Sequence, residues 1–84
     1  MAQTKGEYRV GINFNPAGAD TVNKIKRAAA DLIDLIDSIT VPNAHDNGSA
    51  FHSGEVMRLK AIAQSEVESA AMWAVKAATK PAME

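Results

Sequence analysis

Apolar residues recur in steps of three and four along two stretches of the chain, which is the spacing of one face of an α-helix. In the first stretch the apolar positions are Val22, Ile25, Ala29, Leu32, Ile36 and Ile39. In the second stretch they are Val56, Leu59, Ala63, Val67, Ala70, Ala74 and Ala77. The pattern predicts a first long helix over residues 20–39 and a second over residues 53–80. Residues 1–84 are therefore predicted to form a single all-α domain, an antiparallel hairpin of two long helices.

Residues that favour helix ends and turns separate the two predicted helices. Asp20 or Thr21 can cap the first helix, and a serine at either end of residues 49–53 can cap the second. Residues 40–52 are predicted to form a loop, because they contain the loop formers Pro42, Asn43, Asp46, Asn47, Gly48 and Ser49. Pro81 cannot continue a helix, so it marks the end of the second one.

Residues 1–19 follow a different pattern and are predicted to form an arm. Apolar residues alternate with polar or small ones in this segment, a period of two that is typical of an extended strand. The alternating apolar residues are Tyr8, Val10, Ile12 and Phe14. The sequence offers no second strand, and a lone strand is not stable in water. We therefore expect an extended or short arm that lies along the helices or reaches another subunit.

The second helix is too long and too apolar for one small chain to cover. At about 1.5 Å per residue it spans about 40 Å. Its alanines lie on more than one side, whereas one apolar stripe is enough for a monomer. A chain of 84 residues buries only about 60% of its unfolded surface and benefits from association. These features predict a homo-oligomer.

The composition excludes several classes of function. The chain has no cysteine, so it has no disulfide or thiolate metal site, and a cytosolic location is expected. The N-terminus has no unbroken apolar run, so neither a signal peptide nor a membrane span is expected. The net charge is −1, whereas proteins that bind duplex nucleic acid by bulk electrostatics are usually strongly basic. An anionic partner would therefore need a local basic site.

The charges of the first predicted helix are arranged against its dipole, which typically costs a few tenths of a kcal/mol for each charge. The cations at its N-terminal end are Lys24, Lys26 and Arg27, and the anions at its C-terminal end are Asp31, Asp34 and Asp37. Two explanations are open. Either neighbouring subunits pair with these charges, or the cations lie beside the free N–H groups of the helix start and hold a phosphate.

No arrangement of residues predicts catalysis, a metal site or a cofactor. His45 and His52 are the only histidines, they lie in or beside the predicted loop, and their spacing matches no metal motif. Ser65 and Ser69 lie one helical turn apart, but no base stands at a fixed spacing to activate either of them. We therefore expect a protein that is not an enzyme.

Two segments resemble a known family. Residues 22–26 are similar to the family's sequence of an apolar residue, Asn, a charged residue, Ile and Lys early in its first long helix. Along the second helix, the family's arginine, small apolar residue, hydroxyl residue, methionine and closing Lys-Pro resemble Arg58, Ala61, Ser65, Met72, Lys80 and Pro81. The family consists of small phage proteins that block CBASS immunity by sequestering its cyclic oligonucleotide signals. They share a helical hairpin domain with anti-Thoeris sponge proteins.

The resemblance implies a homo-oligomer, hexameric in the family, that holds cyclic dinucleotides such as cGAMP between two subunits. A lysine and a stacking aromatic residue bind the ligand in the family. Lys26 matches that lysine, and Tyr8 or Phe14 would be the aromatic residue. Lys24 and Arg27 are further candidates for contacts with phosphate.

The resemblance also implies a second kind of pocket, where three subunits meet and a cyclic trinucleotide binds. Arg58 matches the arginine of that pocket, and Ser65 matches a hydroxyl residue close to it.

The first hypothesis is therefore a sponge in the cytoplasm of the infected bacterial host, which sequesters the signal intact and blocks activation of CBASS effectors. The alternative is a structural or regulatory helical-hairpin oligomer whose partner is another protein, because the alanine-rich faces would serve it equally well. A hydrolase of cyclic nucleotides is disfavoured, since the sequence lacks the spacing of a metal or acid–base site.

Overall fold

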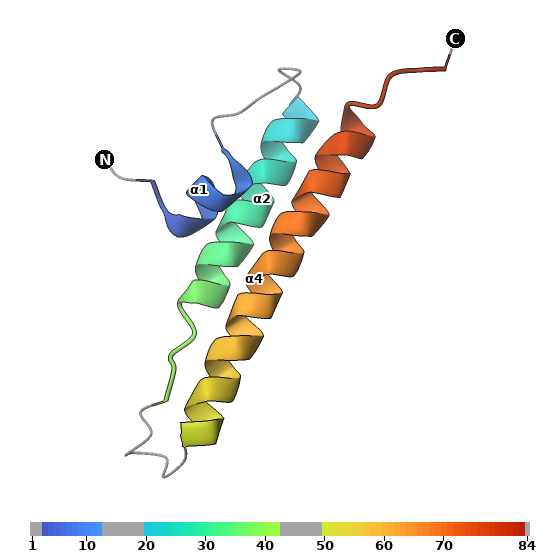
Figure 1. Ribbon diagram of the computed structural model, residues 1–84. Coiled ribbons are helices and arrows are strands. Elements are labelled where there is room, and N and C mark those ends of the chain that lie inside the picture. The colour runs from blue at the N-terminus through green and yellow to red at the C-terminus, as the bar shows by residue number, and fades with distance from the viewer. Residues whose placement is uncertain (1–2, 13–19, 43–49, 84) are drawn as a thin grey trace.

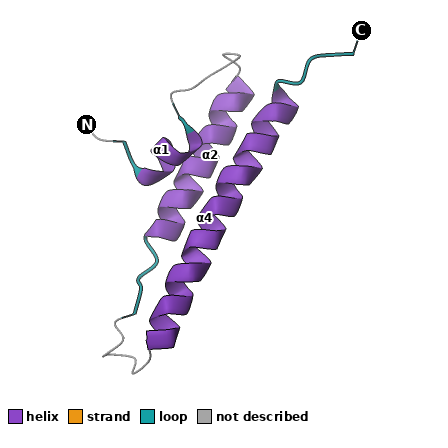
Figure 2. Ribbon diagram, viewed as in Figure 1, coloured by secondary structure: helices purple, strands orange, loops and turns teal. Residues whose placement is uncertain are grey.

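The computed structural model describes residues 3–12, 20–42 and 50–83. Within these ranges it contains three helices and no strand: α1 (Lys5–Val10), α2 (Asp20–Asp37) and α4 (Ala50–Ala78). The two long helices, α2 and α4, run antiparallel side by side, and the short α1 lies against α2 (Figures 1 and 2). The prediction of an all-α hairpin with two long helices is confirmed.

The second long helix begins earlier than the sequence predicts. Residues 50–52, assigned to the loop, form its first turn, and its last residue is Ala78 rather than residue 80. Nothing between Ala50 and Ser53 disfavours a helix, and alanine is the strongest helix former. Ser53 lies inside the helix, where its hydroxyl donates a hydrogen bond to the carbonyl of Pro42 instead of capping a helix start.

The first long helix begins as predicted and ends two residues sooner, at Asp37. Ser38 and Ile39 form a turn in which the Ile39 N–H donates to the carbonyl of Ile36 at 3.0 Å.

The N-terminal segment is helical where the sequence predicts an extended strand. Thr4 and Glu7 form a capping box, in which each backbone N–H donates to the other residue's side chain at 3.0 Å. Gly11 ends the helix with a φ of 65°, a left-handed conformation that glycine adopts without steric cost. These helix-end signals outweigh the alternation of apolar residues, so the expectation of a strand over residues 8–12 is wrong. Phe14 lies outside the described residues.

Helix α1 approaches α2 most closely at Gly6. The Gly6 N–H donates to Oδ1 of Asp34 at 2.7 Å. A Cβ atom added to Gly6 would lie 2.1 Å from the carbonyl oxygen of Ala30, so no other residue fits without moving one of the helices. Close approach of two backbones therefore requires glycine at this position.

Contacts within the chain explain why two aspartates lie at the C-terminal end of α2, against its dipole. Asp34 accepts the hydrogen bond from Gly6. Asp37 accepts hydrogen bonds from Lys5 Nζ at 3.1 Å and from Gln64 Nε2 at 3.3 Å. These carboxylates therefore hold α1 and α4 against α2.

The core is small and lies mainly on α2. Among the described residues, the buried apolar ones are Val22, Ala29, Ala30, Ile33 and Ala71. Gln64 is also buried, and its Nε2 donates to the carbonyl of Ile33 at 3.2 Å. No described helix is long and apolar enough to cross a membrane.

The molecule is flat and leaves much apolar surface uncovered. Its principal dimensions are 60 × 32 × 12 Å, and the shortest of them is close to the diameter of one helix. Its radius of gyration is 16.4 Å, compared with about 12 Å for a compact chain of this length. Exposed large apolar side chains on the long helices include Leu32, Leu35, Phe51, Met57, Leu59, Ile62, Met72 and Trp73. A single layer of helices cannot cover these side chains.

Candidate ligand-binding site

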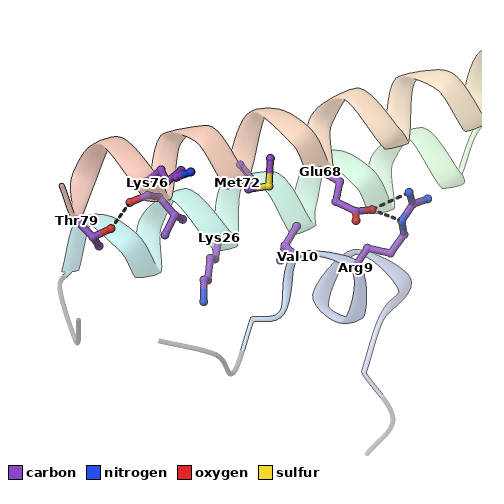
Figure 3. A pocket seen from close by; sticks show the side chains of 9 residues that line it. Arg9, Val10, Lys26, Glu68, Met72, Lys76 and Thr79 are labelled. Atoms are coloured by element: carbon purple, nitrogen blue, oxygen red, sulfur yellow. Dashed lines mark hydrogen bonds and ion pairs between the residues drawn. The ribbon is translucent and has the colours of Figure 1, made fainter. Parts of the chain in front are cut away.

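A pocket of about 520 Å³ opens where the C-terminal end of α1 meets α2 and α4 (Figure 3). It is lined by Arg9, Val10, Lys26, Glu68, Ala71, Met72, Val75, Lys76 and Thr79. Its volume lies within the range of about 300–1,000 Å³ that is typical of small-molecule sites. The lining combines an apolar floor with three cationic side chains and one carboxylate. The pocket is therefore basic, although the whole chain has a net charge of −1.

Lys26 is the most buried cation of this pocket, with 4% of its surface exposed. Its side chain leaves α2 on the side away from α4 (Figure 3). Its ammonium donates to the carbonyl of Gly11 at 3.2 Å. Burial lowers the pKa of Lys26, because it disfavours the charged form. An anionic group bound beside this ammonium would compensate for its lost hydration.

Arg9 and Glu68 form an ion pair at the edge of the pocket, from α1 and α4 respectively (Figure 3). The Nε and Nη2 atoms of Arg9 each lie 2.7 Å from Oε1 of Glu68. Nη2 also donates to Oγ of Ser65 at 3.4 Å. A second pocket of about 310 Å³ lies beside the first and is lined by Arg9, Ser65, Glu68, Ser69 and Met72. The ion pair therefore borders both pockets.

A family model described as the Acb2/Tad1 hairpin domain matches residues 6–79, which include all three helices but the first residue of α1. The chain belongs to the Acb2/Tad1 hairpin family. This is the family of anti-CBASS and anti-Thoeris sponges, so the resemblance seen in the sequence is confirmed. No curated protein and no solved structure matches the chain.

In this Acb2/Tad1 hairpin domain, two of the candidate residues lie at the pockets. Lys26 lines the larger pocket, and Ser65 lines the smaller one. Tyr8 lies on α1 with 76% of its surface exposed, and it lines neither pocket. The structure therefore places Lys26 and Ser65 at two adjacent pockets, and it leaves the ring of Tyr8 exposed to a partner.

The remaining candidates are exposed cations that line neither pocket. Lys24 is exposed on α2. Arg27 forms ion pairs with Glu7 and Asp31, both at 2.8 Å. Arg58 pairs with Glu55 through hydrogen bonds of 2.9 and 2.6 Å.

Three charged residues of the larger pocket are not among the candidates from the sequence: Arg9, Glu68 and Lys76. Arg9 and Glu68 are 59 residues apart, and Arg9 belongs to a segment whose alternation predicted a strand. A capping box at Thr4 and Glu7 with a glycine at position 11 was the signal that could have placed Arg9 in the last turn of a helix.

Two carboxylates around α1 have pKa values below their usual range. A hydrogen bond from Arg27 lowers the pKa of Glu7 from its usual 4.5, and the capping bond from the Thr4 backbone adds to this. A hydrogen bond from Lys5 lowers the pKa of Asp37 from its usual 3.8, and the hydrogen bond from Gln64 lowers it further. The folded protein therefore binds fewer protons than the unfolded chain when the pH lies near these values.

The sign of these shifts predicts an acid-sensitive fold. The stabilisation is fully present above about pH 5 and is lost as the pH falls through the lowered pKa values. We expect the urea midpoint of unfolding to be constant between pH 7 and pH 5 and clearly lower at pH 3. A Glu7→Gln, Asp37→Asn variant should start from a lower midpoint and lose less between pH 5 and pH 3. An equal loss in both proteins would show that other groups cause the acid sensitivity.

Proposed function

We propose that this chain is a phage-encoded sponge that binds cyclic di- and trinucleotide second messengers and releases them unchanged. In the cytoplasm of the infected bacterial host, this binding would prevent the signal from activating CBASS effectors. The chain belongs to the sponge family, and the main structural support for this function is its pocket. The pocket combines an apolar floor with Arg9, Lys26 and Lys76. Apolar and aromatic surfaces suit the faces of bases, and charge-assisted donors suit phosphates. The protein would act by affinity and would not be an enzyme.

We propose further that the binding sites are completed in a homo-oligomer, in which six chains associate. The thickness of 12 Å and the exposed apolar side chains of both long helices support association. Symmetric assembly also allows a short chain to surround a ligand, because several copies contribute the same residues. Tyr8 would then stack on a base from the surface of α1, where it is exposed.

The alternative function is a scaffold that binds another protein through the same exposed helix faces. The apolar side chains Phe51, Met57 and Trp73 on α4 favour this alternative, since none of them lines the larger pocket.

One experiment separates these functions. The purified protein is incubated with a panel of cyclic di- and trinucleotides and filtered, and the retained fraction is heated and analysed by mass spectrometry. A sponge releases intact ligand at a fixed ratio to the chain. Release of a linear or cleaved product would identify an enzyme, and no retained ligand would favour the scaffold.

Arg58→Ala is expected to weaken cyclic trinucleotide binding by about tenfold or more, because a charge-assisted contact is lost, and to spare dinucleotide binding. Among the described residues Arg58 pairs with Glu55, and both side chains are half exposed, so the melting temperature should change little. Titration calorimetry with one ligand of each size measures both affinities. Glu55→Ala breaks the same ion pair but keeps the arginine, so it should leave both affinities intact. Equal loss of both ligands in Arg58→Ala would show a single kind of pocket or a damaged assembly.

A further inference from the structure

In the ion pair between Arg9 and Glu68, two donors of the guanidinium share one carboxylate oxygen. Both donors on one edge of the guanidinium, Nε and Nη2, contact the same oxygen, Oε1 of Glu68, at 2.7 Å. The two parallel N–H groups of this edge fit best when two oxygens face them, one for each donor. A phosphate group carries such a pair of oxygens. It can therefore meet the edge of Arg9 more favourably than Glu68 does in this arrangement.

The position of the pair allows an exchange of partners. The Arg9 and Glu68 side chains are 27% and 44% exposed. An ion pair that water reaches stabilises a protein only weakly, so it can be given up at small cost. Both residues line the larger pocket and the smaller one beside it, so a ligand in either pocket meets the guanidinium. Lys26 from α2 and Lys76 from α4 also line the larger pocket, so all three helices contribute positive charge to it.

The attachment of α1 does not depend on this pair. Gly6 donates to Asp34, and Lys5 reaches Asp37. The carbonyl of Gly11, just beyond the end of α1, accepts a hydrogen bond from Lys26. Arg9 can therefore change its partner while α1 stays on α2.

We propose that Glu68 holds Arg9 while the site is empty and yields it to a phosphate of the ligand. Arg9 is then a phosphate-binding residue, and Glu68 is a specificity-determining residue that acts through Arg9. An anion displaces the carboxylate when it offers two oxygens in the plane of the guanidinium, as a phosphodiester does, whereas chloride does not. This inference rests on the proposed function, because the phosphate that replaces Glu68 as the partner of Arg9 belongs to the proposed ligand.

The test is a cycle of variants titrated with a cyclic dinucleotide in a calorimeter. Arg9→Gln should weaken binding by about 10- to 100-fold, the usual effect of losing a charge-assisted contact. Glu68→Gln should tighten binding by about two- to fivefold, because it removes the competitor from an exposed ion pair. In the double variant the gain from Glu68→Gln should disappear, since its effect passes through Arg9. Arg9→Lys keeps the positive charge but lacks the two parallel N–H donors of the guanidinium. It should therefore bind more tightly than Arg9→Gln and less tightly than the wild type.

Two controls separate the exchange from general effects. Glu66→Gln removes the same charge from an exposed position of α4 that lines neither pocket, so its affinity should match the wild type. The melting temperature of each variant shows whether α1 remains attached. The ¹⁵N signal of Arg9 Nε should shift on ligand addition in the wild type, which a purely structural role would not cause.

Two results would overturn the inference while the proposed function stands. In the first, the wild type binds the dinucleotide and Arg9→Gln binds it equally well. In the second, Glu68→Gln tightens binding as much without Arg9 as with it, which would mean that the carboxylate acts only as a nearby negative charge. If the wild type binds none of the cyclic oligonucleotides, the proposed function fails, and this inference fails with it.

Discussion

Replacing Gly6 by alanine is expected to lower the free energy of unfolding by about 1–3 kcal/mol, the usual cost of forcing extra atoms into a packed contact. The new Cβ would lie 2.1 Å from the carbonyl oxygen of Ala30, so α1 must move away from α2. That movement would also weaken the hydrogen bond of 2.7 Å from Gly6 to Asp34. Urea unfolding followed by circular dichroism measures the loss. Ligand affinity should fall as well, because α1 carries Arg9 and positions the carbonyl that contacts Lys26.

Gly54→Ala is the matched control for this variant. Gly54 lies inside α4, and a Cβ added there meets no atom of the described residues within 4 Å. Alanine should therefore stabilise the protein by about 0.5–1 kcal/mol, because it favours the helix and meets no obstacle. Equal unfolding free energies for Gly6→Ala and the wild type would show that α1 is not packed against α2 as described.

Lys26→Met is expected to weaken the binding of cyclic dinucleotides by about 10- to 100-fold while the fold is retained. Methionine replaces the buried stem of the lysine and removes only the ammonium, whereas alanine would also leave a cavity at a residue that is 4% exposed. The carbonyl of Gly11 loses one donor in the variant, so a modest drop in melting temperature is expected. Titration calorimetry gives the affinity, and circular dichroism confirms the helix content.

Lys80→Met removes the same charge from an exposed residue beyond the end of α4 and should change the affinity by less than about twofold, since exposed charges contribute little. If Lys26→Met and Lys80→Met bind the ligand as well as the wild type does, Lys26 is not part of the site.

The two long helices could be predicted from the sequence because their apolar residues keep one period over many turns. The short helix α1 could not be predicted in the same way, since a segment of six residues offers too few turns to show a helical period. Alternating Tyr8, Val10 and Ile12 favoured a strand instead. The structure shows that the local hydrogen bonds of the capping box and the left-handed Gly11 determine the conformation.

The candidate site was predicted less completely than the fold, because it depends on where α1 is placed. Lys26 was found through a short motif in one helix. Arg9 and Glu68 come together only after α1 packs on α2, through contacts between residues 28 to 59 positions apart. The aspartates of α2 that oppose its dipole were the sign of this packing in the sequence, because two of them bind α1. Their partners could not be assigned until α1 was known to be a helix.

Native mass spectrometry of the purified protein, with and without a cyclic dinucleotide, tests the central claim most directly. It reports the number of chains in the particle and the mass of what they hold. The account predicts a particle of six chains that gains a whole number of intact ligand masses when the dinucleotide is added. A particle whose mass does not change on addition, or one that carries only cleaved fragments, would contradict the sponge.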